Sequence, residues 1–475
     1  MASPQSFFFY DLETSGLNPR HDRIMQFAGQ RTDMEFKPIG EPINLLVKTT
    51  EDILPSPSAI LVTGITPQKT LRDGLTEAEF TKFLQKEVFT PGTIVVGYNN
   101  VRFDDEFMRH TFWRNFHDPY EWEWKDDRSR WDLLDVVRLV RALRPEGINW
   151  PVIIKDGEKV STNNLVDLAK QNGFENKQAH DALADVNALI SLTKLVKEKQ
   201  PKIFDYLLKH RGKTEVAKLV NLENPQPFVY ASGRYSNEHE KTVIAIPVAP
   251  GKNPGTVLVY DLTRDINEYK NYTKTEFEQA VLPRYRQKDP EHPLSLPVKE
   301  LNYGRCPAVA PTKVLDKETQ QRIGVFIDQA ENNLAELKRN QGVLDKIIAA
   351  WRDQPEYASS KDVEGQLYDS FTPDDDKPRI RQIPQLTLEE LADYHPNFTD
   401  ERLPELLLRY KARNFPKAMS ETEQAKWLQY RAERFNARIQ EYLKELQKLH
   451  EEGRDDFILQ ELQLWAESIY PEPED

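Results

Sequence analysis

Two hydrophobic periods alternate along residues 6–197. Apolar and β-branched runs predict strands at residues 7–10, 26–32, 43–48 and 94–97. Apolar residues at helical spacing predict helices at residues 76–86, 105–112, 133–143, 163–172 and 181–198. Strands that alternate with helices indicate an α/β arrangement, with a mixed sheet and helices on its faces.

The middle of the chain has a different pattern. Turns with Gly or Pro separate short extended segments at residues 228–231, 242–248, 256–260, 296–299 and 308–310. Short strands joined by turns predict a small β-barrel or half-barrel. Residues 318–340 then have helical spacing, and we interpret them as a helical elaboration of this barrel.

From about residue 355 the pattern is mostly helical. Thr387-Leu388-Glu389-Glu390 and Ser420-Glu421-Thr422-Glu423 both match the capping box at a helix start. A stripe at helical spacing, which we interpret as core rather than as a partner-binding face, consists of Trp427, Leu428, Tyr430, Arg431, Phe435, Ile439, Tyr442 and Leu443. Residues 373–378 are read as a charged loop or linker.

Length and composition indicate a folded protein of several domains. At 475 residues the chain is too long for one compact core, so two or three domains are expected. Hydrophobic residues make up 39% and charged residues 30%, which excludes a disordered chain. The beginning of the chain has no signal-peptide pattern or membrane span. Cys306 is the single cysteine, so no intrachain disulfide is expected, in agreement with a reducing cytoplasm.

The net charge of −13 argues against a protein that coats duplex DNA without specificity, because such proteins usually carry a basic excess. It does not exclude a nucleic-acid enzyme, since a local basic groove can hold a strand while the remaining surface is acidic. Part of the negative charge belongs to a group of carboxylates described next.

Three motifs carry the candidate chemistry. Asp11 and Glu13 are two residues apart on a predicted strand and therefore share a face. Asp104 lies where a helix follows the strand at 94–97; alternatively, Asp104 or Asp105 is only a favourable charge at a helix N-terminus. His180 and Asp185 lie at the start of another predicted helix, although a lone histidine before a helix is often structural.

Together these five residues predict metal-assisted cleavage of a phosphodiester. Carboxylates that share a partly buried site repel one another unless cations lie between them. Mg²⁺ and Mn²⁺ are the oxygen-preferring ions that suit such a set. His180 is the side chain that exchanges a proton most easily near neutral pH.

In their order along the chain, the three motifs resemble the DEDDh, or DnaQ-like, 3′→5′ exonucleases. Further segments are similar to bacterial exonuclease I: residues 128–136, 143–151, 200–207 and 410–416. This resemblance, which covers nearly the whole chain, implies a ribonuclease H-like exonuclease domain at residues 6–197. It also implies an SH3-like β-barrel domain at 201–353 and a C-terminal helical domain at 355–475, in a monomeric cytoplasmic protein.

The resemblance further implies an activity. The enzyme is expected to degrade single-stranded DNA to 5′-mononucleotides, processively, in DNA repair and recombination. Two Mg²⁺ ions, replaceable by Mn²⁺, are expected about 3.5–4 Å apart. Asp11 would bridge both ions, Glu13 and Asp185 would complete their shells, Asp104 would bind directly or through water, and His180 would act as the base. An exoribonuclease of the same superfamily and a non-catalytic strand-binding scaffold are the alternatives.

Candidate strand-binding residues gather in one stretch, where rings that stack on bases alternate with guanidinium groups for phosphates. They are Arg109, Arg114, Tyr120, Trp122, Trp124, Arg128, Arg130, Trp131 and Arg138. For Trp131 a core position is the preferred interpretation. The resemblance implies contacts to single-stranded DNA from Glu13, Arg109, Tyr120, Trp124, Arg138, Asn164 and His180. Asn164 stands where known relatives carry a basic residue, which puts that contact in doubt.

The resemblance also implies a protein partner, the acidic C-terminal tail of single-stranded DNA-binding protein. Such a tail needs an apolar pocket rimmed by Lys or Arg that can grip its terminal carboxylate. Lys338 and Arg339 are the candidates for this rim. Alternatively, they are ordinary charges at a helix C-terminus, where cations are favoured.

Overall fold

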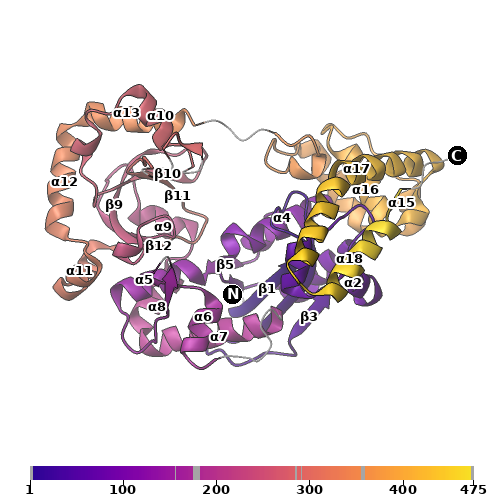
Figure 1. Cartoon of the computed structure of the whole chain (residues 1–475), viewed down its shortest axis with the longest axis horizontal. Helices are drawn as coiled ribbons and strands as arrows, with labels where there is room; N and C mark the ends of the chain where they lie inside the picture. Colours follow the sequence, from indigo (N-terminus) through magenta and orange to yellow (C-terminus); the bar gives the residue numbers. More distant parts are fainter. Residues whose placement is uncertain are drawn as a thin grey trace. The chain divides into compact units, whose positions relative to one another are not determined.

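The computed structural model describes residues 4–471 except 156, 175–181, 284–285, 290, 292 and 355–358. The chain forms two compact units, and neither is continuous in sequence (Figure 1). The first consists of Met1–Ser129, Asn176–Asn187 and Ala358–Asp475, and the second of Arg130–Glu175 and Ala188–Tyr357. Strand β5 (Ser129–Asp132) and helix α7 (Ala182–Lys199) each cross the boundary.

The sheet of the first unit is mixed, as predicted. Its strands are β1 (Ser6–Thr14), β2 (Ile24–Thr32), β3 (Ile43–Leu46) and β4 (Thr93–Gly97). They lie in the order β3-β2-β1-β4. Strand β1 pairs antiparallel with β2 and parallel with β4. The central position of β1 fixes the register of Asp11, opposite Ala28, and of Glu13, opposite Gln26.

Helices from both ends of the chain complete the first unit. They are α1 (Pro57–Thr63), α2 (Pro67–Asp73), α3 (Glu77–Phe83), α4 (Asp104–Arg114), α14 (Lys377–Gln382), α15 (Leu388–Ala392), α16 (Leu403–Asn414), α17 (Glu421–Glu451) and α18 (Asp456–Ser468). One core cluster joins Phe8 and Phe27 of the sheet to Phe80 and Phe107 of α3 and α4. A second joins Met25 and residues near α1 to α17 and α18. Helix α18 lies beside α2 (Figure 1).

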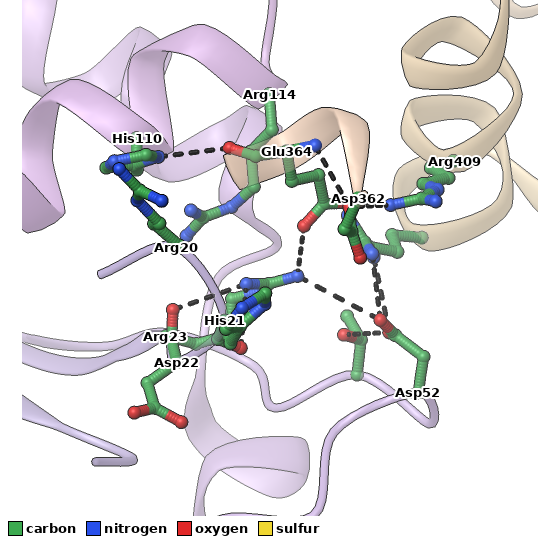
Figure 2. A network of polar contacts seen from close by, with 12 residues as sticks. Arg20, His21, Asp22, Arg23, Asp52, His110, Arg114, Asp362, Glu364 and Arg409 are labelled. Atoms are coloured by element: carbon green, nitrogen blue, oxygen red, sulfur yellow. Dashed lines mark hydrogen bonds and ion pairs between the residues drawn. The ribbon is translucent and has the colours of Figure 1, made fainter. Parts of the chain in front are cut away.

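A buried network of charges, shown in Figure 2, ties the C-terminal helices to the rest of the first unit. The Arg23 guanidinium, 2% exposed, lies 2.5 Å from the Glu364 carboxylate. Arg413 of α16 bonds Glu364 at 2.5 Å and Asp52 at 2.8 Å. Arg114 of α4 forms a two-pronged pair with Glu77. Removing one partner of such a pair leaves an uncompensated buried charge, which costs about 3–5 kcal/mol.

The second unit contains the predicted barrel. Its strands are β8 (Phe228–Ala231), β9 (Thr242–Pro250), β10 (Thr256–Asp261), β11 (Val298–Asn302) and β12 (Ala308–Pro311). They form one antiparallel sheet in the order β11-β10-β9-β8-β12. A separate hairpin is made by β6 (Val152–Lys155) and β7 (Glu158–Ser161).

Further helices complete the second unit (Figure 1). They are α5 (Leu133–Leu143), α6 (Leu165–Gln171), α8 (Pro201–Lys209), α9 (Lys213–Leu219), α10 (Lys274–Ala280), α11 (Lys317–Ile323), α12 (Ile327–Arg339) and α13 (Gln341–Arg352). Helix α5 contacts β8, β9 and β12. Among the described residues, no helix combines the length and the apolar character needed to cross a membrane.

Three expectations from the sequence are corrected. The helical stretch predicted at 318–340 is two helices, because Gly324 adopts φ 64° and ends α11. In the C-terminal stripe, Leu428 and Leu443 are 40% and 44% exposed rather than in the core. Residues 373–378, expected as a charged loop or linker, form a 3₁₀ turn at Asp374–Asp376 and the start of α14, and the buried carboxylate of Asp376 accepts hydrogen bonds from the backbone of Thr399 and Asp400.

Candidate active site

Three carboxylates meet where β1 and α7 approach each other. Asp11 and Glu13 project from the same face of β1, and Asp185 comes from the first turn of α7. One oxygen of each lies within 4.8 Å of the others, and all three side chains are half-buried. The predicted grouping of Asp11, Glu13 and Asp185 is therefore present in the structure.

Asp104 lies near this group at the start of α4. Its side chain is buried. Burial raises the pKa of Asp11 well above its usual value, and the charges of Asp104, Asp185 and Glu13 raise it further. Such a set of oxygen donors disfavours its own ionisation and would be stabilised by a hard divalent cation. The residues therefore fit a divalent metal.

The neighbouring carboxylate, Asp105, has a structural role. It is fully buried, and its Oδ1 accepts hydrogen bonds from the Tyr10 hydroxyl at 2.6 Å and from the Asn100 amide at 3.1 Å. Asp105 thus ties α4 to β1, next to Asp11. The sequence did not separate the roles of Asp104 and Asp105, because the partners of Asp105 lie on other elements.

The loop after β1 is closed by short-range hydrogen bonds that sequence reasoning did not identify. The Ser15 amide donates to the Arg23 carbonyl at 2.8 Å, and the Arg23 amide donates to Ser15 Oγ at 2.8 Å. A Cβ atom on Gly16 would lie 2.3 Å from the Asp22 carboxylate, so a larger residue there would displace this carboxylate from the Asn18 amide that it accepts from at 2.8 Å. The buried Arg23 side chain then connects this loop to Glu364 (Figure 2).

His180, the expected base, lies outside the described residues. Helix α7 is described from Ala182 onward, and Asp185 falls in its first turn.

In the first unit, the candidate strand-binding residues are of two kinds: aromatic rings that are exposed, and a cation that already forms ion pairs with carboxylates. Trp124 is 63% exposed and Tyr120 is 37% exposed, so both rings are open to a base. Arg109 is mostly buried and pairs with Glu106 at 2.8 Å and Glu123 at 2.6 Å, with its guanidinium over the Tyr120 ring. A phosphate would have to compete with these carboxylates.

Other members of the same stretch are structural. Trp122 is buried in the first core, and Arg114 is buried against Glu77. Arg128 donates to the Phe89 carbonyl at 2.5 Å. Arg114, Trp122 and Arg128 therefore hold structural positions in the first unit.

Three candidates and one predicted core residue lie in the second unit. Arg130 is buried, and its guanidinium donates to the Gly304 carbonyl at 2.9 Å. Arg138 of α5 pairs with Asp135 at 2.5 Å. Asn164 is the N-cap of α6, where its side-chain oxygen accepts from the Val166 and Asp167 amides. Trp131 is 1% exposed and packs edge-on against Phe204, which confirms its core position.

Lys338 and Arg339 occupy the last turn of α12. Both are exposed, and Arg339 pairs with Glu336 one turn earlier at 2.6 Å. Their placement agrees equally with a partner-binding rim and with cations that favour a helix C-terminus.

Three family profiles match successive parts of the chain. Residues 8–193 match the family described as Exonuclease, residues 211–353 the Exonuclease I SH3-like domain, and residues 361–469 the Exonuclease I C-terminal domain.

Known proteins match over nearly the whole length. An exodeoxyribonuclease I of Haemophilus influenzae is 40% identical over 457 residues, which cover 96% of each chain. That of Escherichia coli is 38% identical over 471 residues and 98% of each chain.

Among solved structures, E. coli exonuclease I in complex with a dA16 oligonucleotide superposes with a TM-score of 0.91 at 38% identity, over 98% of this chain and 100% of that one. Exonuclease I of Methylocaldum szegediense gives 0.89 at 39% identity with the same coverage. A zinc-bound form of the E. coli enzyme with single-stranded DNA gives 0.91 at 37% identity, again covering 98% of this chain and 100% of that chain.

Proposed function

Because the chain belongs to the exodeoxyribonuclease I family, we propose that it is a metal-dependent 3′→5′ exonuclease that releases 5′-mononucleotides from single-stranded DNA. The observation that carries this proposal is the convergence of Asp11, Glu13 and Asp185 within 4.8 Å of one another. The solved relatives in complex with oligonucleotides support single-stranded DNA as the substrate.

Asp11, Glu13 and Asp185, together with Asp104, would hold divalent cations. We propose Mg²⁺, with Mn²⁺ able to replace it. The cations would supply positive charge that stabilises the transition state at the phosphorus and lowers the pKa of water. The raised pKa of Asp11 supports this assignment, because an adjacent cation favours the ionised carboxylate that the four acids together disfavour.

His180 is proposed as the general base that takes a proton from the attacking water. It precedes Asp185 by five positions in the sequence. A neutral imidazole near neutral pH accepts a proton readily, and a positioned base contributes about 10²–10⁴-fold to the rate.

Strand binding is assigned to rings and cations. Tyr120 and Trp124, whose rings are exposed, would stack on bases, and Arg109 and Arg138 would contact phosphates. Glu13 and His180 would also touch the terminal nucleotide. Asn164 would contact the strand through its side-chain NH₂ group, because its side-chain oxygen caps α6.

Further proposals rest on the family. The three-part division at residues 6–197, 201–353 and 355–475 follows the expected domains. We propose a monomeric, cytoplasmic enzyme, processive on single strands and acting in DNA repair and recombination. Its partner is proposed to be the acidic tail of single-stranded DNA-binding protein, held by Lys338 and Arg339.

A nuclease assay tests the main proposal. End-labelled single-stranded DNA, duplex DNA and single-stranded RNA are incubated with the enzyme, with Mg²⁺ or with a chelator. The expected result is metal-dependent release of mononucleotides from the 3′ end of single-stranded DNA. Preference for RNA would favour the exoribonuclease alternative, and binding without cleavage in every metal would favour the scaffold.

A further inference from the structure

Positive charge gathers in the second unit where the barrel meets α5. The meeting point is Ser232 and Gly233, directly after β8. A Cβ on Gly233 would lie 2.8 Å from Nη2 of Arg138, so the guanidinium lies against the glycine backbone. The Ser232 amide donates to the Lys241 carbonyl at 2.9 Å, and Lys299 Nζ donates to Ser232 Oγ. Three cationic side chains therefore belong to residues that contact this short segment.

The turn that carries Lys241 has an unfavourable backbone. Glu240 has φ 45° and Lys241 has φ 60°, a left-handed conformation that residues with a side chain rarely adopt. The surrounding structure holds this turn in place. The Glu240 carboxylate pairs with Arg141 at 3.0 Å and accepts from Ser161 Oγ at 2.9 Å. Strained residues that are held this firmly tend to occur at ligand-binding positions.

Lys241, unlike Arg138 and Arg141, forms no ion pair with a carboxylate among the described residues. Asp135 is engaged by Arg138 and Glu240 by Arg141, while the Lys299 ammonium lies 4.3 Å from the centre of the Tyr230 ring. Lys241 Nζ forms no hydrogen bond or ion pair with any other residue that the structure describes. Burial, together with the charge of Arg138, lowers the pKa of Lys241, and the charge of Glu240 offsets this only in part.

We propose that Lys241 and Arg138 form a binding site for one backbone phosphate of single-stranded DNA. The inference rests on the proposed function, which supplies the strand. A planar guanidinium and a compact ammonium are complementary donors for a phosphate. A contact of this kind carries no base information, in keeping with an enzyme that must bind every sequence. The fixed turn holds the ammonium in place before the strand arrives.

Equilibrium binding without cleavage tests this site. A fluorescent oligo-dT is titrated with protein in the presence of a chelator, at several salt concentrations. Lys241→Gln is expected to bind about three- to tenfold more weakly, and the slope of log K against log salt to fall by about 0.7, the value for one phosphate on a single strand. Lys241→Arg should bind like the wild type.

Two further variants separate binding from folding and from net charge. Lys241→Gly relieves the left-handed strain, so its melting temperature should equal or exceed that of the wild type while its affinity falls. A merely structural role would not lower affinity in a variant that folds at least as well. Lys252→Gln removes the same charge from an exposed lysine of the same barrel, whose ammonium lies over Trp351, and should bind normally.

Unchanged affinity and salt slope in Lys241→Gln would overturn the site, as would an equal loss in Lys252→Gln. A loss of affinity for an acidic peptide with DNA binding unchanged would reassign the cations to a protein partner and also overturn it. Failure of the proposed function is distinguishable, because it would appear as absence of nucleotide release by the wild-type enzyme with metal.

Discussion

At the scale of a single residue, the backbone of Asp11 is held firmly while the charge of its side chain is disfavoured. It lies in the central strand, where the sheet fixes it, and among other acids, where its charge is disfavoured. The alternation of side chains along a strand made the pairing of Asp11 with Glu13 predictable. The structural role of Asp105 was not predictable, because its partners Tyr10 and Asn100 lie on other elements. The capping role of Asn164 was not predictable either, because it depends on where α6 begins.

Asp11→Asn should abolish nucleotide release without loss of stability in the absence of metal. The substitution keeps the size of the side chain and removes one of four repelling charges. Saturating Mg²⁺ should raise the melting temperature of the wild type, because a ligand that binds only the folded state stabilises it, and should leave the variant unchanged. Melting curves with and without Mg²⁺, beside a cleavage assay, check this. Near-normal turnover would remove Asp11 from the site, and Asp185→Ala should behave in the same way.

His180→Ala should slow the chemical step about 10²–10⁴-fold with metal binding preserved. Single-turnover rates across neutral pH measure the step, and calorimetric titration with Mn²⁺ measures the metal. A rate that is unchanged over this pH range would show that His180 is not the base.

Tyr120→Ala combined with Trp124→Ala should weaken binding of single-stranded DNA, since each stacked base contributes about 1–3 kcal/mol. Cleavage of a short substrate at saturation should change less. Trp122, buried in the core between the two positions, gives the contrasting variant: Trp122→Ala should lower the melting temperature first. Equal affinity in the double variant would mean that the exposed rings do not touch the strand.

At the scale of elements, the spacing of apolar residues and the positions of turn-forming residues predicted most of the secondary structure. Helix α5 has the predicted bounds, 133–143, because an apolar face is bounded by an N-cap aspartate and an arginine-proline end. The β6–β7 hairpin was missed although Asp156-Gly157 between two β-branched segments is a hairpin signature in the sequence. The buried network was not predictable, since Arg23 and Glu364 are 341 positions apart.

Two histidines, the buried His110 and the half-buried His117, make the stability of the fold depend on pH. Burial lowers the pKa of His110 to about 3 and that of His117 to about 4. In the unfolded chain both take up a proton below about pH 6.5. Between that value and the folded pKa the unfolded state binds more protons, so stability falls as pH falls, by about 1.4 kcal/mol per pH unit for each histidine.

The network carboxylates act at lower pH. The arginines around Glu364 hold the pKa of its carboxyl group well below the usual range. The ion pairs of Glu364 therefore stabilise the fold fully above about pH 4.5, and this stabilisation is lost as pH falls through the pKa of Glu364 in the folded state. Denaturant unfolding from pH 7.5 to pH 5 should therefore show a slope that His110→Gln reduces and Glu364→Gln does not. Equal slopes in wild type and His110→Gln would contradict the assignment.

At the scale of the whole molecule, the proposed partner is tested with a labelled peptide that has an acidic, hydrophobic-ended tail. The wild type should bind it, more weakly as salt rises, because exposed charges are screened. Lys338→Ala with Arg339→Ala should weaken binding. No binding by the wild type would remove the partner, and equal binding by the double variant would remove only the site.

The discontinuity of the first unit has a consequence for how the protein is made. Met25 and Leu54 pack in one core cluster with Phe435, Tyr442 and Trp465. A ribosome synthesises the first strands hundreds of residues before their last packing partners. Residues 4–129 must therefore wait, with apolar surface uncovered, while the whole second unit emerges and can fold. The core of the unit that holds Asp11, Glu13 and Asp185 is thus completed late in translation, so a truncated nascent chain carries the three motifs without the finished core of that unit.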